Sequence, residues 1–165
     1  SAVRVMFELE VSDPFIEFRQ LGIVDRFGRT AVRTGSSNNP WAGHETGDGW
    51  VVMGNAVVDK GVVSAMANAM REFEAEDIET RLMHSISAGT DAGGQPDGQR
   101  AAAVVVHENE GYPIVNLRVD DHDEPMKDLW RLFNKMRPLV PYYRQRPDDP
   151  TLGRVVDWKK KQGIE

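Results

Sequence analysis

The order of apolar patterns along the chain is the sequence feature that most restricts its fold. Some stretches alternate or run continuously apolar, which is typical of strands, and others repeat every three to four residues, which is typical of helices. In chain order the strand-like pieces are 17–34 and 49–55, the helical ones 59–75 and 77–88, then come strands at 101–106 and 114–119 and a helix at 125–136. Because the elements come in blocks, the sequence predicts an α+β protein with helices on a mainly antiparallel sheet.

Four further segments need separate interpretation: the two ends of the chain, the stretch 89–99 and the apolar run 101–106. Residues 1–12 alternate like a strand, but their apolar residues also fall on one helical face with Ser1 as N-cap, and both alternatives stay open. Residues 89–99 are Gly-rich but lack the Lys-Ser/Thr pair of a phosphate-binding loop, so a flexible connection is expected. The continuous apolar run 101–106 predicts a strand buried on both faces. We predict a domain over 1–140 and a polar, Pro-rich, extended tail over 141–165 that needs a partner surface.

Composition excludes several classes of function. The 165 residues carry a net charge of −6 with a pI near 5.3, which disfavours nucleic acid as a partner. The chain has no cysteine, so disulfides, thiolate catalysis and Cys-based zinc sites are excluded. It has no apolar run of the roughly 20 residues that a membrane span needs, and its start lacks a signal-peptide pattern. We therefore expect a cytoplasmic protein that does not bind membranes.

The segment 40–55 holds two Trp, one His and several Gly, a composition that an ordinary surface loop does not require. We expect the functional site here, with His44 as an acid–base group, an orienting group or a metal ligand, and Asn55 as an oxyanion donor. Asp48 and Glu45 are candidates to orient the His44 ring. Trp41, Gly43 and Asp48 are the expected substrate-binding residues. Each has a structural alternative: a His ring packed between tryptophans, a turn-forming Asn, and an Asp that belongs to a Gly-flanked turn.

A second candidate group ends the predicted strand 114–119. Asp120 and His122 share one face of an extended chain and are expected to bind substrate or stabilise the site. A metal pair or an Asp–His dyad is the alternative, but spacing identifies no third ligand, so neither a metal nor another cofactor is predicted. The neighbouring acids Asp121, Asp123 and Glu124 also fit the cap of the helix that begins at Pro125.

Three motifs in this order resemble one family. They are 18–25 (FRQLGIVD), the Trp41-Ala42-Gly43-His44 segment with its continuation to Gly54-Asn55, and 119–125 (VDDHDEP). Over about residues 1–137 the chain resembles the bacterial and archaeal domain-of-unknown-function family numbered 1028. That family is grouped with the N-terminal-nucleophile (Ntn) hydrolases, so the resemblance implies a four-layer αββα fold.

The resemblance also implies that the chain corresponds to the C-terminal two-thirds of a family domain. The expected function is then a subunit or part of an Ntn-type hydrolase acting on a non-peptide C–N amide bond, cyclic ones included, of a small molecule. Its nucleophile is either Ser1 or a residue on a separate N-terminal part. We expect association with such an N-terminal chain or a homo-oligomer. The alternative is a non-catalytic ligand-binding or assembly subunit.

Overall fold

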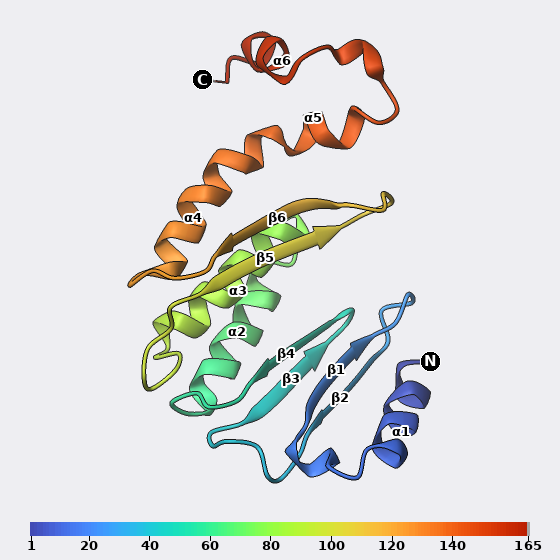
Figure 1. Ribbon diagram of the computed structural model, residues 1–165, viewed down its shortest axis with the longest axis vertical. Helices are drawn as coiled ribbons and strands as arrows, with labels where there is room; N and C mark the ends of the chain where they lie inside the picture. The colour runs from blue at the N-terminus through green and yellow to red at the C-terminus, as the bar shows by residue number, and fades with distance from the viewer. Residues whose placement is uncertain (165) are drawn as a thin grey trace. The chain divides into compact units, whose positions relative to one another are not determined.

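The computed structural model describes residues 1–164 and shows a mixed α+β protein, as predicted (Figure 1). Each sheet that it contains among these residues is a two-stranded antiparallel hairpin. The chain divides into two compact units, which we call unit 1 (Ser1–Gly98) and unit 2 (from Gln99 onward). No helix of the described part is both long and apolar enough to cross a membrane.

Unit 1 contains two hairpins, a short N-terminal helix and a pair of longer helices (Figure 1). In chain order these are α1 (Ala2–Ser12), the 3₁₀ turn η1 (Ile16–Phe18), β1 (Gln20–Val24), β2 (Thr30–Thr34), β3 (Gly43–Gly47), β4 (Trp50–Gly54), α2 (Lys60–Glu72) and α3 (Ile78–Asp91). The hairpin predicted over 17–34 is confirmed, with Gln20 opposite Thr34 at its open end. The sequence analysis predicted β4 but missed its partner β3.

Residues 1–12 are helical, which settles the ambiguity left by the sequence. The Ser1 hydroxyl caps α1 by accepting from the Arg4 amide at 3.4 Å. Ala2 and Met6, one turn apart, are buried, whereas most of the other apolar residues of α1 are exposed. The amide of Ala2 also donates to Asp25 at 3.2 Å, which ties the start of the helix to the β1–β2 turn.

The core of unit 1 lies between the second hairpin and α2. Trp50 and Val52 of β4 pack against Ala67 and Met70 of α2. The helix α3 packs on α2 so closely that a Cβ at Gly89 would lie 2.7 Å from Met66 Cγ. Because α3 continues to Asp91, the Gly-rich loop predicted from residue 89 begins later than expected.

Unit 2 begins with a hairpin of β5 (Ala102–His107) and β6 (Pro113–Val119), followed by α4 (Pro125–Met136). The prediction that 101–106 is buried on both faces is wrong. Val104 and Val106 are buried, but Val105 between them is 51% exposed. The reason is that β5 belongs to an antiparallel hairpin, in which alternate side chains point to opposite faces, rather than to a central parallel strand.

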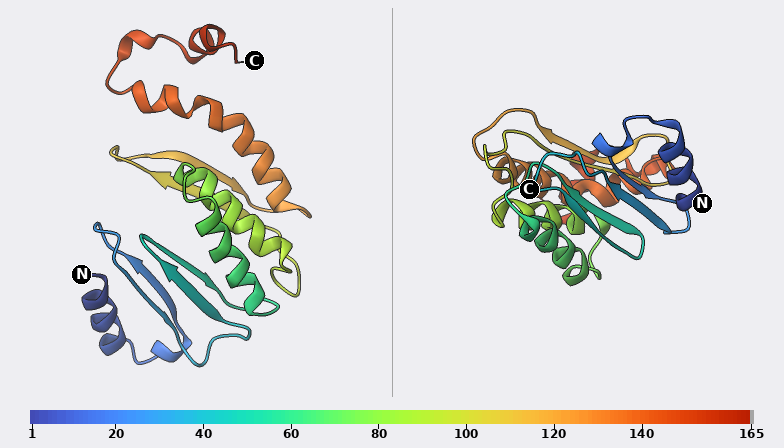
Figure 2. Two further views of the ribbon diagram at one scale, coloured as in Figure 1. Left: turned by 180° about the vertical axis from the view of Figure 1, so that it is seen from behind. Right: turned by 90° about the horizontal axis from the view of Figure 1, so that it is seen from below.

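The segment predicted as an extended tail is largely helical (Figure 2). In chain order it contains α5 (Val140–Gln145), the 3₁₀ turn η3 (Pro150–Leu152) and α6 (Val155–Gln162). Tyr142 and Trp158 are buried with ring centroids 5.5 Å apart, and the Tyr142 hydroxyl donates to the Gly153 carbonyl at 2.6 Å. These aromatic residues therefore pack on one another within the segment, a packing that its polar, Pro-rich composition did not predict.

Candidate active site

A pocket of about 550 Å³ lies in unit 1 where β2 ends and β3 begins. Its lining residues are Thr34, Gly35, Ser36, Asn38, Pro40, Trp41, Ala42, Gly43 and His44. They include the first part of the Trp/Gly/His segment, and none of them is an acid, a lysine or an arginine. The volume is within the usual range of small-molecule sites.

A chain of side-chain hydrogen bonds leads into this pocket. Asn55 Nδ2 donates to Gln20 Oε1 at 3.0 Å, and Gln20 Nε2 lies 3.0 Å from Thr34 Oγ1. Thr34 Oγ1 in turn lies 2.8 Å from His44 Nδ1. Gln20 Nε2 also contacts the carbonyl oxygens of Gly43 and Gly54, each at 3.0 Å. One glutamine on β1 therefore bridges to both strands of the second hairpin and to the residue that touches His44.

The chemistry of these groups fixes what His44 can do. An amide NH₂ only donates, and the two N–H groups of Gln20 are shared among three acceptors, Thr34 Oγ1 and the carbonyls of Gly43 and Gly54. When Thr34 accepts from Gln20, its own proton is available for His44 Nδ1. In that arrangement Nε2 carries the ring proton and faces away as a donor. The hydroxyl oxygen has a second lone pair, so it also accepts from a protonated Nδ1, which leaves Nε2 as a base. Thr34 Oγ1 can therefore accept from Nδ1–H both in the neutral ring, whose Nε2 is a base, and in the imidazolium, whose Nε2–H is an acid.

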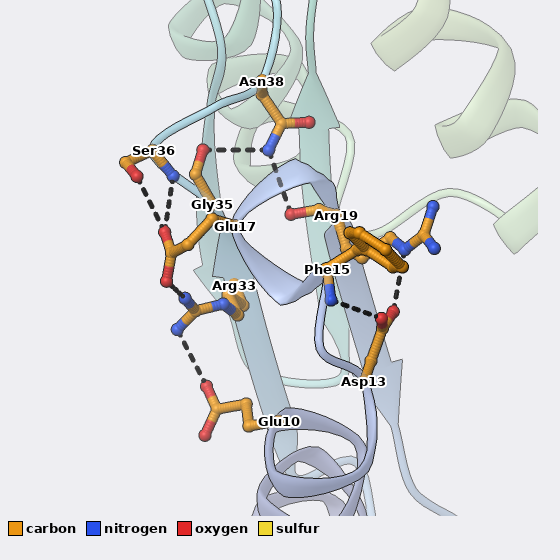
Figure 3. Close-up of polar contacts among 9 residues, drawn as sticks. All are labelled: Glu10, Asp13, Phe15, Glu17, Arg19, Arg33, Gly35, Ser36 and Asn38. Carbon is orange, nitrogen blue, oxygen red and sulfur yellow. Dashed lines mark hydrogen bonds and ion pairs between the residues drawn. The ribbon is translucent and has the colours of Figure 1, made fainter.

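The wall formed by residues 35–38 is held by a separate group of contacts (Figure 3). Asn38 Nδ2 donates to the carbonyls of Arg19 and Gly35, at 3.0 and 2.9 Å. Glu17 accepts from the Ser36 amide and hydroxyl, and it forms an ion pair with Arg33. Hydrogen bonds from the Ser36 amide and then its hydroxyl, assisted by Arg33, lower the pKa of Glu17. These contacts connect the loop to η1 and to β2.

Packing explains much of the unusual composition of the segment. A Cβ at Gly43 would lie 2.2 Å from Trp41 Cη2, and one at Gly47 would lie 2.2 Å from Trp50 Cε2. Each tryptophan ring therefore covers a glycine that has no room for a side chain. Trp50 belongs to the buried core, whereas Trp41 is half-buried and lines the pocket.

Two carboxylates of the segment do not orient His44. Asp48 lies in the β3–β4 turn, four strand residues from His44 and hence about 13 Å away along the strand. Glu45 accepts from Ser64 at 2.9 Å and pairs with Arg71 at 2.9 Å, which joins β3 to α2. Asp48 therefore occupies a turn, which was the structural alternative for this residue. The side chain that contacts the His44 ring is Thr34.

Asp120 and His122 lie in unit 2 and do not bind each other there. Asp120 pairs with Arg118 at 2.5 Å, and His122 Nδ1 accepts from the Glu124 amide at 2.9 Å. Arg100 joins Asp121 and Asp123 at 2.5 and 2.6 Å, and these bonds lower the pKa of Asp121. The described residues bring no three His, Asp or Glu side chains together in a metal-binding group.

Gln20 and Thr34 are the two residues of this arrangement that the sequence analysis missed as site residues. The signal was present, because a hairpin over 17–34 with its turn at 25–29 places positions 20 and 34 opposite each other. What the hairpin does not reveal is that its open end lies beside the start of β3. That proximity comes from tertiary packing, in which β1 lies near β4 and β2 near β3.

The structure is that of a mixed α+β protein, with a pocket of about 550 Å³ between its first two antiparallel hairpins. Residues 1–129 match the family of unknown function DUF1028, and the chain belongs to that family. The crystal structure of protein SPO2555 from Silicibacter pomeroyi, also assigned to DUF1028, is similar with a TM-score of 0.70 and 29% identity. The match covers 95% of this chain and 63% of the length of that one. No functionally curated protein matches the chain.

Proposed function

We propose that unit 1 carries the acid–base site of a hydrolase that cleaves a non-peptide C–N amide bond, open-chain or cyclic, in a small molecule. One observation carries the proposal: His44 is held at 2.8 Å by the Thr34 hydroxyl on the wall of a pocket of about 550 Å³. Amide cleavage requires a proton on the departing nitrogen, and a positioned imidazole supplies one. Because no acid, lysine or arginine lines the pocket, an uncharged amide suits it.

The role of each side chain follows from the hydrogen-bonding groups that its contacts leave unused. His44 Nε2 exchanges the proton, while Thr34 and Gln20 hold the ring. Asn55 does not line the pocket; its Nδ2 donates to Gln20 Oε1, so we propose that it holds Gln20 in place rather than polarising the substrate carbonyl. Trp41 and Gly43 form the apolar side of the pocket.

We place the nucleophile outside the residues described above. The Ser1 hydroxyl accepts a hydrogen bond as the cap of α1, a structural use that favours a nucleophile elsewhere in the family domain. The alignment leaves more than a third of the SPO2555 chain without a counterpart here. We extend the proposal to the four-layer αββα arrangement of the Ntn hydrolases, in which that part would complete the site.

The test is hydrolysis of a panel of linear and cyclic small-molecule amides by the wild type and by the His44→Asn variant, each assayed together with the part of the family domain that is proposed to supply the nucleophile. We expect the variant to lose about 10²–10⁴-fold in kcat/KM. His107→Asn, a change at an exposed histidine of unit 2, is the matched control and should retain the rate. Equal rates for the wild type and His44→Asn would refute the acid–base role.

A non-catalytic binding role is the second candidate. It is favoured by the absence, among the described residues that line the pocket, of any carboxylate to support His44. In that case the same amides should quench the fluorescence of Trp41 without being hydrolysed. A Trp41→Phe variant would establish that the signal comes from the pocket.

A further inference from the structure

The wall of the pocket formed by residues 35–38 has used its backbone donors within the protein. Its four backbone N–H groups all donate to oxygens of Glu17, Arg19 or Gly35, at 2.8 to 3.3 Å. The Ser36 hydroxyl donates to Glu17 as well, at 2.8 Å. A ligand that reaches this wall therefore finds these donors already occupied.

The Asn38 side chain offers this wall a free acceptor. Its Nδ2 lies 3.0 Å from the Arg19 carbonyl oxygen and 2.9 Å from the Gly35 carbonyl oxygen (Figure 3). Carbonyl oxygens only accept, so the atom that contacts both of them is the NH₂ group, and both of its N–H bonds are used. The orientation of the amide is thereby fixed, and no group among residues 1–164 donates to its Oδ1.

A fixed acceptor of this kind selects among ligands. Asn38 lines the pocket and is half-buried, so a bound ligand takes the place of solvent near it. A ligand N–H pairs with Oδ1, whereas a ligand oxygen at the same place opposes one lone pair to another and leaves the acceptor unpaired.

The charges behind the wall act in the same direction. Glu17 and Glu10 share one guanidinium, that of Arg33, so this group carries a net negative charge (Figure 3). Negative charge attracts the partly positive hydrogen of an N–H group and repels a carboxylate.

We propose that Asn38 determines the specificity of the pocket, by accepting at Oδ1 a hydrogen bond from an N–H group of the ligand. The inference rests on the proposed function only in taking that ligand to be an amide. Primary and secondary amides, open-chain or cyclic, carry the required N–H, whereas tertiary amides, esters and carboxylates do not. The carboxylate product of amide cleavage lacks this bond and therefore binds more weakly than the substrate.

Binding of two small molecules of similar shape to the full chain tests the proposal. N-Methylbenzamide carries an N–H where methyl benzoate carries an ester oxygen. In titrations followed by tryptophan fluorescence, the wild type should bind the amide about 10-fold more tightly than the ester, because the ester leaves the acceptor unpaired. Equal affinities, or no binding of N-methylbenzamide up to its solubility limit, would overturn the proposal.

Two variants locate the preference within the wall. Asn38→Leu removes the acceptor at similar side-chain volume and should abolish the preference for the amide. Asn39→Leu is the matched control and should keep it, because Asn39 is exposed and does not line the pocket. The ¹⁵N shifts of the Ser36 and Ser37 amides, which donate to Glu17, report whether the wall stays in place. An Asn38→Leu variant that keeps the preference overturns the proposal, and if its wall has moved, the comparison in the wild type decides.

The two proposals fail in different ways, because binding does not require hydrolysis. Selective binding of N-methylbenzamide, without hydrolysis of any amide once the rest of the family domain is present, would refute the hydrolase and leave the role of Asn38. Hydrolysis of tertiary amides as fast as that of secondary ones would refute the role of Asn38 and leave the hydrolase.

Discussion

At the scale of single residues, the candidate site depends on a threonine that carries no obvious chemical signal. Thr34 accepts from Gln20 and contacts His44 Nδ1, so it connects a structural glutamine to the acid–base group. A hydroxyl has a rotatable proton and two lone pairs, so it can pair with the ring in either tautomer.

Replacing Thr34 with valine keeps the β-branched shape and removes this connection. We expect Thr34→Val to change the tautomer populations of His44, as measured by the ¹⁵N chemical shifts of its ring, and to lower amide hydrolysis by about 10-fold or more. Thr30→Val, at the other end of β2, is the control and should leave both unchanged. Unchanged His44 shifts in Thr34→Val would contradict the positioning role.

Asp25 predicts a pH dependence at the same scale. Burial raises the pKa of this carboxyl, but hydrogen bonds from the Phe27 amide, the Arg29 side chain and the Ala2 amide outweigh it and lower the pKa to about 2. The carboxylate is thus stabilised in the folded state relative to its ordinary pKa of 3.8. Its contribution to stability is complete above that ordinary value and is lost as the pH falls through about 2.

The measurement is urea unfolding of the wild type and Asp25→Asn between pH 7 and pH 2. We expect the variant to be less stable at pH 7, and the difference to shrink as the pH falls below about 4. Asp97→Asn is the control, because the exposed Asp97 side chain has no partner among residues 1–164. A constant difference between the wild type and Asp25→Asn over this range would show that the hydrogen bonds do not favour the charged form.

At the scale of elements, β5 shows how pairing determines burial. Its six residues include five that are apolar, which by composition alone is typical of a strand covered on both sides. In the structure it pairs antiparallel with β6, and Val104 and Val106 are buried while Val105 is exposed. Helix α4, with Leu129 and Phe133 buried, supplies the apolar surface of this unit.

Alanine substitutions along β5 should therefore alternate in their effect. Val104→Ala removes buried methyl groups and should lower the free energy of unfolding by about 1–3 kcal/mol. Val105→Ala, at an exposed position, should change it by less than about 0.5 kcal/mol. Chemical denaturation of the two variants measures the difference, and equal losses would support burial of both faces.

At the scale of the whole molecule, the net charge of −6 is the property most open to test. Like charges keep copies of a protein apart, and this repulsion vanishes at the isoelectric point. We expect the solubility of the chain to be lowest near pH 5.3 and to recover on both sides, as followed by light scattering against pH. A minimum far from this value would indicate that several carboxyl groups titrate abnormally in the folded protein.

Much of this protein was determined by local sequence. The helices α2, α3 and α4, the first hairpin and the strands β4, β5 and β6 follow from apolar periodicity and turn residues, because these depend on neighbours within a few positions. The three motifs also identified the family, which the match over residues 1–129 confirms.

Tertiary structure decided the rest, since it depends on which elements lie together. Only packing of the two hairpins brings Gln20 and Thr34 to His44. Whether residues 1–12 formed a helix or a strand was undecided by their alternating pattern. Burial of Ala2 and Met6 on one side of α1 resolved it, and left Val3, Phe7 and Val11 exposed. A local pattern fixes the candidate faces of an element, but only contacts with distant residues determine which face becomes core and which becomes a site.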